Sequence, residues 1–205
     1  MASPPHTKAS RDDWIGAALA ALADQPIDQL KVLVLADALD VARSSFYWYF
    51  ADRDELLEAL LAIWERNTQS IVERSARVAP SVAAACLGVF ECWADEHLYN
   101  PALDLAVRDW GRRDDAIAVR VQRADETRLA TLTSMFARYG FDPADALVRA
   151  RLLYHSQVGY YAVGTSEPVA ARLAYLPHYL SAMTATDATV EEFAAFEAFL
   201  LGRPS

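Results

Sequence analysis

The chain is poor in lysine, glycine and cysteine, and it contains no long uncharged apolar run. Its 205 residues include two lysines, seven glycines and two cysteines. No stretch reaches the roughly 18 apolar residues of a transmembrane helix, and the first residues lack the apolar run of a signal peptide. We therefore expect a cytoplasmic protein without a membrane partner, with loose ends at residues 1–10 and 201–205.

Basic charge is also scarce. Acidic residues outnumber basic ones by 28 to 19, so the formal net charge is -9. Residues 1–66 hold six Lys or Arg and eleven Asp or Glu, a net charge of 6 − 11 = −5. A chain with this balance does not attract nucleic acid or anionic membranes indiscriminately. Any contact with DNA must depend on a few local cations, such as Lys8 and Arg11 near the N-terminus.

The sequence has no recognisable catalytic or metal-binding motif. Cys86 and Cys92 are six residues apart, about 600° around a helix, so they point in different directions and neither bond to each other nor share a metal. We expect two free, buried thiols in a reducing compartment. There is no Gly-rich phosphate loop, HExxH or G-x-S-x-G, and the four histidines are scattered. No enzymatic activity, cofactor or metal is expected.

The hydrophobic periodicity is helical almost throughout, which predicts an all-α fold. Helix starts are marked by the capping pairs Ser10 with Asp13 and Thr189 with Glu192, and by Asp142 before Pro143. The expected helices are about 10–23, 30–39, a short one ending at 50, 52–78, 81–97, 101–110, 114–139, 142–163, 169–182 and one from 189 onward. Three short helices thus precede a connecting helix and several longer ones.

Five consecutive aromatic residues, Phe46–Phe50, stand in the third of these helices. Phe46 and Phe50 are four positions apart, so they share one face and are expected to pack inward. Tyr47 and Trp48 lie on other faces. One short helix cannot turn five adjacent side chains inward, so we expect some of these rings to contact a partner.

The segment around this helix resembles the DNA-binding segment of the tetracycline-repressor (TetR/AcrR) family. The family pattern is matched in order and spacing by Leu35, Ala36, Leu39, Val41, Ser45, Phe46, Tyr47, Tyr49, Phe50, Arg53, Leu56 and Leu57. The resemblance implies an N-terminal helix-turn-helix domain, residues 1–51, and a larger C-terminal ligand-binding and dimerisation domain, residues 52–205. Two positions depart from the pattern. Asp40 replaces the turn glycine, although Asp tolerates a left-handed conformation, and Ala42 replaces the usual Ser or Thr cap.

The resemblance also implies a set of DNA contacts. An arginine at the start of the recognition helix, here Arg43, can read a guanine edge, or it is a solvated charge or a phosphate contact. Arg53 is expected to grip a phosphate, with a surface pair to Asp52 or Glu55 as its alternative. For the serines the alternative is helix capping, and Lys31 could neutralise another phosphate at the start of the second helix. The full set of expected DNA-binding residues is Lys31, Arg43, Ser44, Ser45, Tyr47, Trp48, Tyr49 and Arg53.

In the resembled family the later helices form a ligand cavity. Aromatic and polar residues on amphipathic helices are candidates for its lining, because such cavities are mostly apolar with a few polar groups. The candidates are Trp93, His97, Arg108, Trp110, Met135, Tyr154, Gln157 and Tyr161. Ordinary core packing is the alternative for each of them. Arg108 has a further alternative, an ion pair with Asp104 at i, i+4.

The family resemblance implies a homodimer, and the last helix carries a phenylalanine stripe that needs covering. We expect a two-fold contact made by this helix and the one at 142–163. The expected interface residues are Leu153, Phe193, Phe196, Phe199 and Leu200. Packing within one chain is the alternative.

These inferences lead to one functional expectation. The chain is expected to be a DNA-binding transcriptional regulator, a repressor that a small-molecule effector releases from its double-stranded DNA operator. The alternative, kept open by the acidic N-terminal residues, is a helical small-molecule-binding or interaction protein of the same fold that has lost DNA binding.

Overall fold

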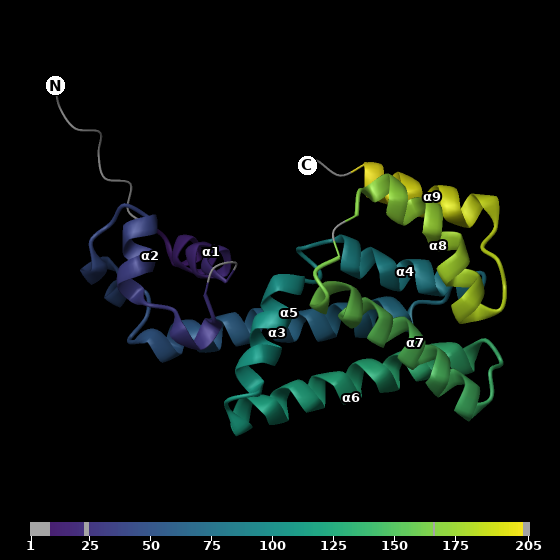
Figure 1. The fold of residues 1–205 in the computed structure, drawn as a ribbon, viewed down its shortest axis with the longest axis horizontal. Coiled ribbons are helices and arrows are strands. Elements are labelled where there is room, and N and C mark those ends of the chain that lie inside the picture. The colour runs from purple at the N-terminus through teal and green to yellow at the C-terminus, as the bar shows by residue number, and fades with distance from the viewer. Residues whose placement is uncertain (1–8, 23–24, 166, 203–205) are drawn as a thin grey trace. The chain divides into compact units, whose positions relative to one another are not determined.

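The computed structural model describes residues 9–22, 25–165 and 167–202. These residues form α-helices, two short 3-10 helices and turns, with no strand among them (Figure 1). The prediction of an all-α fold is therefore confirmed. Lys8 and most of the two expected loose ends lie outside the described residues.

The helices follow the order and the approximate bounds expected from periodicity and capping. They are α1 (Arg11–Ala21), η1 (Ile27–Gln29), α2 (Val32–Ala38), η2 (Arg43–Trp48), α3 (Arg53–Ala76), α4 (Val82–Ala94), α5 (Pro101–Gly111), α6 (Asp115–Arg138), α7 (Pro143–Ala162), α8 (Val169–Thr184) and α9 (Val190–Leu201). No helix in the described part of the chain combines the length and apolar character that crossing a bilayer requires.

The predicted helix starts form as the sequence indicates. Ser10 and Asp13 make a reciprocal capping box at α1, and Thr189 and Glu192 make another at α9. The Asp142 side chain accepts hydrogen bonds from two backbone N–H groups at the start of α7. Each cap supplies an acceptor to donors that the helix itself leaves unpaired.

The chain divides into two compact units. The N-terminal unit contains the residues up to Glu65 together with Ala102–Val121, and the C-terminal unit contains Arg66–Pro101 and Gln122–Ser205. Both α3 and α6 pass from one unit to the other.

An aromatic cluster forms the centre of the N-terminal unit. Phe46 is fully buried, with its ring centroid 5.2 Å from that of Trp14 and 5.1 Å from that of Phe50. The Trp14 contact is edge-on and the Phe50 contact is stacked, both favourable arrangements. Contacts of α2 with α1 and η2 complete this small core.

A larger apolar core holds the C-terminal unit together. Here α4 packs against both α8 and α9, and α7 packs against α8. Cys86 and Cys92 are buried in this unit as free thiols, as predicted. Burial raises the pKa of each thiol to about 12, because the thiolate would lose its hydration.

Candidate nucleic-acid interface and ligand cavity

A tight turn joins α2 to η2. The Val41 N–H donates to the Ala36 carbonyl (N to O 3.1 Å), and the Asp40 N–H donates to the Asp37 carbonyl (3.2 Å). These two bonds form a Schellman motif, which requires a left-handed residue at the position of Asp40. Asp40 adopts φ 53°, so aspartate supports the turn in place of glycine, as predicted.

The rings of the aromatic run are buried on one face of the helix and exposed on the other. Phe46 and Phe50 are buried, whereas Tyr47 is 49% and Trp48 64% exposed, and Tyr49 is half-buried. The segment Arg43–Trp48 is a 3-10 helix. No side chain caps its start, because Ala42 stands at that position. Two large rings are thus presented to solvent directly after the turn.

Arg43 and the serines lie at the start of this helix. The Arg43 guanidinium donates to the Tyr47 hydroxyl across one turn (3.2 Å). Ser45 donates its hydroxyl proton to the Ala42 carbonyl (2.7 Å), so it has a local structural partner, while Ser44 is exposed. Arg43 is therefore held on the same exposed side as the Tyr47 ring.

Arg53 is engaged within the protein. Its Nε donates to the Leu30 carbonyl (2.8 Å) and its Nη2 donates to the Asp28 carbonyl. Its nearest carboxylate is that of Asp54 at 3.9 Å, instead of the expected Asp52 or Glu55. These bonds fasten the start of α3 to the residues before α2. The phosphate contact expected of Arg53 stays a prediction.

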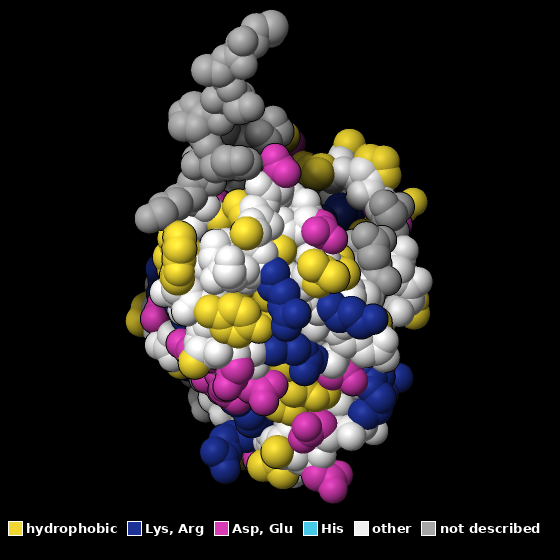
Figure 2. Space-filling model, turned by 90° about the vertical axis from the view of Figure 1, so that its left-hand side faces the viewer, with side chains coloured by type: hydrophobic (Ala, Val, Ile, Leu, Met, Phe, Trp, Pro, Cys, Tyr) yellow, Lys and Arg dark blue, Asp and Glu magenta, His cyan; other side chains and the backbone are white. Residues whose placement is uncertain are grey.

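Several expected DNA-binding residues meet at one place. Lys31, Arg43, Tyr47 and Arg53 all line a surface hollow beside α2 and η2, together with Asp28 and Asp52. Figure 2 faces this end of the molecule and shows Lys and Arg side chains in a short band, with exposed apolar side chains beside it and carboxylates next to both. The cationic surface is narrow, as the acidic composition predicts.

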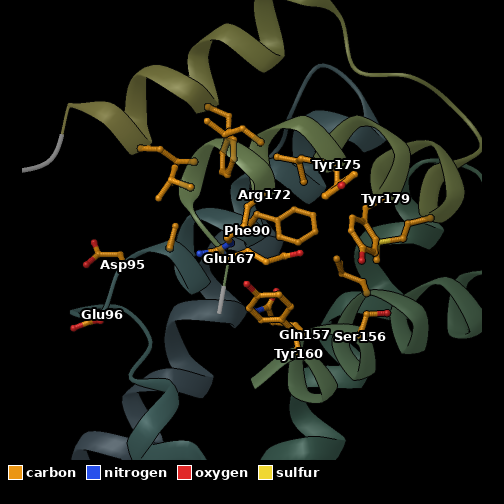
Figure 3. Close-up of a pocket in the computed structure, with 18 of the residues that line it drawn as sticks. Phe90, Asp95, Glu96, Ser156, Gln157, Tyr160, Glu167, Arg172, Tyr175 and Tyr179 are labelled. Carbon is orange, nitrogen blue, oxygen red and sulfur yellow. The ribbon is translucent and has the colours of Figure 1, made fainter. Parts of the chain in front are cut away.

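A cavity of about 770 Å³ lies within the C-terminal unit. Residues from α4, α7, α8 and α9 and from the turn after α4 surround it (Figure 3). Its lining consists of Phe90, Ala94, Asp95, Glu96, His97, Leu153, Ser156, Gln157, Tyr160, Glu167, Val169, Arg172, Leu173, Tyr175, Leu176, Tyr179, Met183, Phe196 and Leu200. This volume is typical of sites for drug-sized molecules, about 300–1,000 Å³.

Five Phe and Tyr rings contribute to the cavity wall. Phe90, Tyr160, Tyr175 and Tyr179 surround its centre in Figure 3. Tyr175 and Tyr179 are 55% and 54% exposed, so the cavity opens to solvent along α8. The rings provide stacking surface for a planar or apolar molecule, and their hydroxyl groups stay accessible to water.

Some polar groups of the cavity lining have hydrogen-bond partners within the described part of the protein, and others have none there. Gln157 is 8% exposed, and its Nε2 has no hydrogen-bond partner among the described residues. The Arg172 guanidinium lies over the Tyr160 ring, 5.5 Å from the ring centroid. Asp95 and Glu96 stand apart at one side of the view in Figure 3. Among the described residues, no group of three His, Cys, Asp or Glu side chains could hold a metal ion.

The structure separates the eight candidate ligand residues. His97 and Gln157 line the cavity. Arg108 and Trp110 lie on α5 in the N-terminal unit and do not belong to the cavity lining. Arg108 pairs with the buried Asp104 (Nε to Oδ2 2.7 Å), which is the alternative named for it above. Asp104 also accepts a hydrogen bond from the Trp64 indole (2.8 Å).

The other four candidates belong to the packed interior. Met135 is fully buried in the core, and Trp93 is 4% exposed. The Tyr161 hydroxyl donates to the Trp93 carbonyl (3.0 Å). The Tyr154 hydroxyl donates to Asp125 (2.6 Å) and accepts from the buried Arg128 (2.9 Å). These polar tips bond protein groups, and none of the four residues lines the cavity, so a ligand contact for them stays a prediction.

The five expected dimer residues have partners within one chain. Leu153, Phe196 and Leu200 line the cavity, and Leu153 and Phe196 are buried. Phe193 packs against the core of the C-terminal unit, and the Arg74 guanidinium lies 5.9 Å from the centroid of the Phe199 ring. Because α9 packs on α4, the phenylalanine stripe is covered largely without a second subunit.

Sequence reasoning missed most of the cavity wall, above all Tyr160 and the residues of α8. Arg172, Tyr175 and Tyr179 occur at i, i+3 and i+7 and therefore share one helix face. A helix face with large rings and a cation is too polar for a closed core and too aromatic for an ordinary solvent-exposed face. The sequence therefore contained a sign of a binding surface on α8. Only the packing of α8 beside α4 and α7 shows that this surface lines a cavity.

Comparison with known proteins agrees with this architecture. Residues 15–60 match a family model described as bacterial regulatory proteins, tetR family. No curated protein sequence matches the chain. Among solved structures, AmtR of Mycobacterium smegmatis superimposes with a TM-score of 0.65 and 20% identity, covering 100% of both chains. GusR of Salmonella enterica gives a TM-score of 0.62 and 19% identity over 85% of this chain and 93% of its own.

A third solved structure has a bound ligand in its description. It is the transcriptional regulator FadR of Bacillus subtilis in complex with stearoyl-CoA, with a TM-score of 0.51 and 14% identity over 95% of this chain and 100% of its own. At such identities the likeness establishes a shared fold.

Proposed function

We propose that this chain, whose residues 15–60 form a domain of the tetR family of bacterial regulatory proteins, is a ligand-responsive regulator of transcription. Its operator is double-stranded DNA, its effector is a small molecule, and it works in the cytoplasm. One observation carries the DNA-binding part. A Schellman turn at Asp40 is followed at once by a short helix that exposes Arg43, Tyr47 and Trp48.

The exposed groups suit a recognition helix. An arginine at the start of such a helix can take a bidentate grip on guanine, and Tyr47 keeps Arg43 oriented through the hydrogen bond between them. Tyr47 and Trp48 offer contacts to the DNA backbone and to base methyl groups. Because the surrounding surface holds few cations, we expect specific binding with weak nonspecific attraction.

The direct test is a gel shift with the DNA that flanks the gene for this protein, at about 50 and 200 mM salt. The wild-type protein should shift this DNA in the presence of excess unrelated DNA. Trp48→Ala should weaken the shift, whereas Val78→Ala, at an exposed loop residue of the C-terminal unit, should leave it unchanged. Absence of any sequence-specific wild-type shift at the lower salt would refute the DNA-binding role.

The net charge of −5 in residues 1–66 favours a second candidate function. A protein of the same fold that has lost DNA binding would bind a small molecule or a partner without an operator. In the gel-shift test this protein would bind no DNA at either salt concentration while still binding ligands in its cavity.

We propose further that the protein is a repressor and that an effector in the cavity releases it from DNA. The cavity volume of about 770 Å³ and its aromatic wall support binding of a mostly apolar molecule. FadR, which shares the fold, was solved with stearoyl-CoA, a ligand with a long apolar part. Release follows if the effector binds better to a conformation whose recognition helices no longer fit successive major grooves, about 34–36 Å apart.

We propose that the protein acts as a homodimer. Leu153 and Phe196 are buried within one chain, whereas Phe193, Phe199 and Leu200 are partly exposed, and we add a second candidate face. On α7, Val148 and Leu152 are 51% and 47% exposed and lie four positions apart on one face. A second copy placed on this face would make the same contact in both directions.

Sedimentation tests this interface. Leu152→Asp should convert a micromolar wild-type dimer into monomers, because a carboxylate would be buried at the contact. Val78→Asp is a matched control, since Val78 is 88% exposed and lies in a loop. A wild-type monomer at micromolar concentration would contradict the dimer, and a dimeric Leu152→Asp variant would move the interface elsewhere.

A further inference from the structure

We propose that the effector is an organic acid, with an apolar body of one or more rings and a carboxylate group that Gln157 and Arg172 hold. This inference depends on the proposed function of the cavity as the effector site, and it names the chemical class of the ligand. It is carried by two hydrogen-bond donors in the cavity lining, Gln157 and Arg172, and by the aromatic rings around the cavity centre.

Gln157 supplies the first donor. Its side chain is more than nine-tenths buried, it lines the cavity, and its Nε2 has no acceptor among the described residues. A buried amide N–H that has lost water without gaining an acceptor is unfavourable, so an oxygen placed there by a ligand would restore the missing bond. This donor therefore selects a ligand with an exposed oxygen.

Arg172 supplies the second donor and a positive charge. Within the described part of the chain its guanidinium forms no ion pair, and it lies 5.5 Å from the centroid of the Tyr160 ring. Gln157 and Tyr160 are three positions apart on α7 and therefore share a face. Arg172 lies over that ring, so we place both donors on the Tyr160 side of the cavity, where one carboxylate would accept from the amide and from the guanidinium.

The body of the ligand would occupy the aromatic part of the cavity. Phe90, Tyr175 and Tyr179 surround the cavity centre in Figure 3, and Leu176 and Met183 add aliphatic surface. Ring stacking and burial of apolar area would provide most of the affinity, while the two donors would orient the acid group.

The acidic residues of the lining favour a competing class, an organic cation. Three carboxylates line the cavity, those of Asp95, Glu96 and Glu167. The Asp95 carboxylate already accepts the His97 backbone N–H (2.9 Å), and Asp95 and Glu96 stand apart from the rings in Figure 3. Glu167 is the one lining carboxylate that the view shows among the rings, where the Arg172 guanidinium also lies. A cation beside Tyr160 would be repelled by Arg172 and would leave the Gln157 amide without an acceptor. The carboxylate is therefore the better match.

Calorimetric titration of the full-length protein with three probes that share one ring system tests the choice. The probes are 1-naphthylacetate, 1-naphthylacetamide and 2-(1-naphthyl)ethylammonium. The acetate should bind at least tenfold more tightly than the ammonium. The acetamide should lie between them, because it keeps an oxygen for Gln157 and loses the charge that Arg172 attracts.

Two variants assign the donors. Gln157→Met should weaken the acetate and the acetamide alike, by roughly tenfold, because both use the amide N–H. Arg172→Gln should weaken the acetate by a similar factor and leave the acetamide nearly unchanged. Arg151→Gln, which removes an exposed arginine of α7 outside the cavity lining, should change neither affinity.

Every other result overturns the inference. Tightest binding of the ammonium probe would assign the cavity to organic cations. Equal binding of all three probes would mean that apolar contacts alone provide the affinity. No binding of any probe at millimolar concentration would exclude this ligand class. The gel shift is measured independently on the same protein, so a failure of the carboxylate preference leaves DNA binding intact and is distinguishable from a failure of the regulatory function.

Discussion

In the N-terminal unit two rings of the aromatic run are exposed to solvent, whereas in the C-terminal unit several rings line a cavity. Tyr47 and Trp48 stand in solvent on a helix of six residues whose other face is buried. Tyr160 and Tyr179 line a cavity that four helices form together and that opens to solvent along α8. The first arrangement depends on neighbours in the sequence, and the second depends on segments brought together by folding.

The arginines differ in the same way. In the N-terminal unit Arg53 and Arg113 bind the residues before α2, and Arg120 pairs with Glu58 and Glu65. The Arg43 guanidinium donates to the uncharged hydroxyl of Tyr47, so its charge stays available to DNA. Most cations of this unit bond groups of the protein itself. Recognition of DNA would therefore depend on a small number of contacts.

The largest effect should come from Phe46→Ala. Phe46 is fully buried between Trp14 and Phe50, and deleting such a ring costs about 3–5 kcal/mol. Hydrogen exchange followed by mass spectrometry should show lost protection in α1, α2 and η2. The C-terminal unit should keep its protection and its ligand affinity, because its own core contains none of these residues.

Trp48→Ala is the matched control, since Trp48 belongs to the same helix but is 64% exposed. It should change stability by no more than about 0.5 kcal/mol while weakening DNA binding. Equal loss of protection in both units after Phe46→Ala would mean that the two units unfold as one, and the contrast drawn between them would fail.

The second prediction concerns Tyr154, which connects a buried cation to a carboxylate in the C-terminal unit. Tyr154→Phe removes the hydroxyl that bonds Arg128 and Asp125, and this change should lower stability by about 1–3 kcal/mol. Ligand affinity should remain the same, because Tyr154 is absent from the cavity lining. Urea denaturation and calorimetric titration measure the two quantities separately.

Tyr160→Phe should behave in the opposite way, because Tyr160 lines the cavity and is half-buried. Its stability should change little, and the affinity for a carboxylate probe should change. If Tyr154→Phe reduced ligand affinity and left stability unchanged, Tyr154 would be a ligand residue after all.

Local features were predictable from the sequence because their partners lie within a few residues. The capping boxes at Ser10 and Thr189 follow from side chains three positions apart, and the left-handed turn at Asp40 follows from its place in the family pattern. The inward placement of Phe46 and Phe50 follows from the same helical spacing. The helix order and the family resemblance depend on signals of this kind.

The cavity could not be predicted in this way. Its wall combines residues of α4 with residues of α8 and α9 that lie about a hundred positions later in the chain, and periodicity does not say which helix faces meet. An aromatic residue on an amphipathic helix, such as Tyr154, is a candidate for a cavity lining, but the Tyr154 hydroxyl bonds Arg128, 26 positions away. Arg53 was assigned to a phosphate, yet it bonds carbonyl groups 23 and 25 positions before it.

The third prediction separates the two arginines of the surface hollow. Arg43→Ala should relax the sequence preference at one base pair of each half-site, at a cost of about 1–3 kcal/mol in discrimination, and leave the fold unchanged. Arg53→Ala should lower stability, because the Leu30 and Asp28 carbonyl groups lose their donor. A binding-site selection assay and a denaturation curve measure these effects.

The outcome decides whether Arg53 also contacts DNA. If it holds a phosphate, Arg53→Ala should weaken all sequences alike and reduce the salt dependence by about one unit per site. A change of preferred sequence in Arg53→Ala but not in Arg43→Ala would contradict the placement of η2 in the major groove.

The smallest effect should come from the ion pair of Asp28 with Arg113 at the surface of the N-terminal unit (2.8 Å). The hydrogen bond from Arg113 holds the pKa of Asp28 below its ordinary value. A carboxyl whose pKa falls on folding stabilises the protein above its unfolded pKa, near 3.9, and loses that contribution as pH falls further. A double-mutant cycle of Asp28→Asn and Arg113→Gln, measured by denaturation, should therefore give a small favourable coupling at pH 7 that shrinks below pH 4. The same cycle on Asp145 and Arg149, a pair four residues apart on α7, should also give a small coupling. This coupling should affect the unfolding of the C-terminal unit and not that of the N-terminal unit. A coupling between Asp28 and Arg113 that persisted unchanged at pH 2 would show that their contact does not depend on the carboxylate charge.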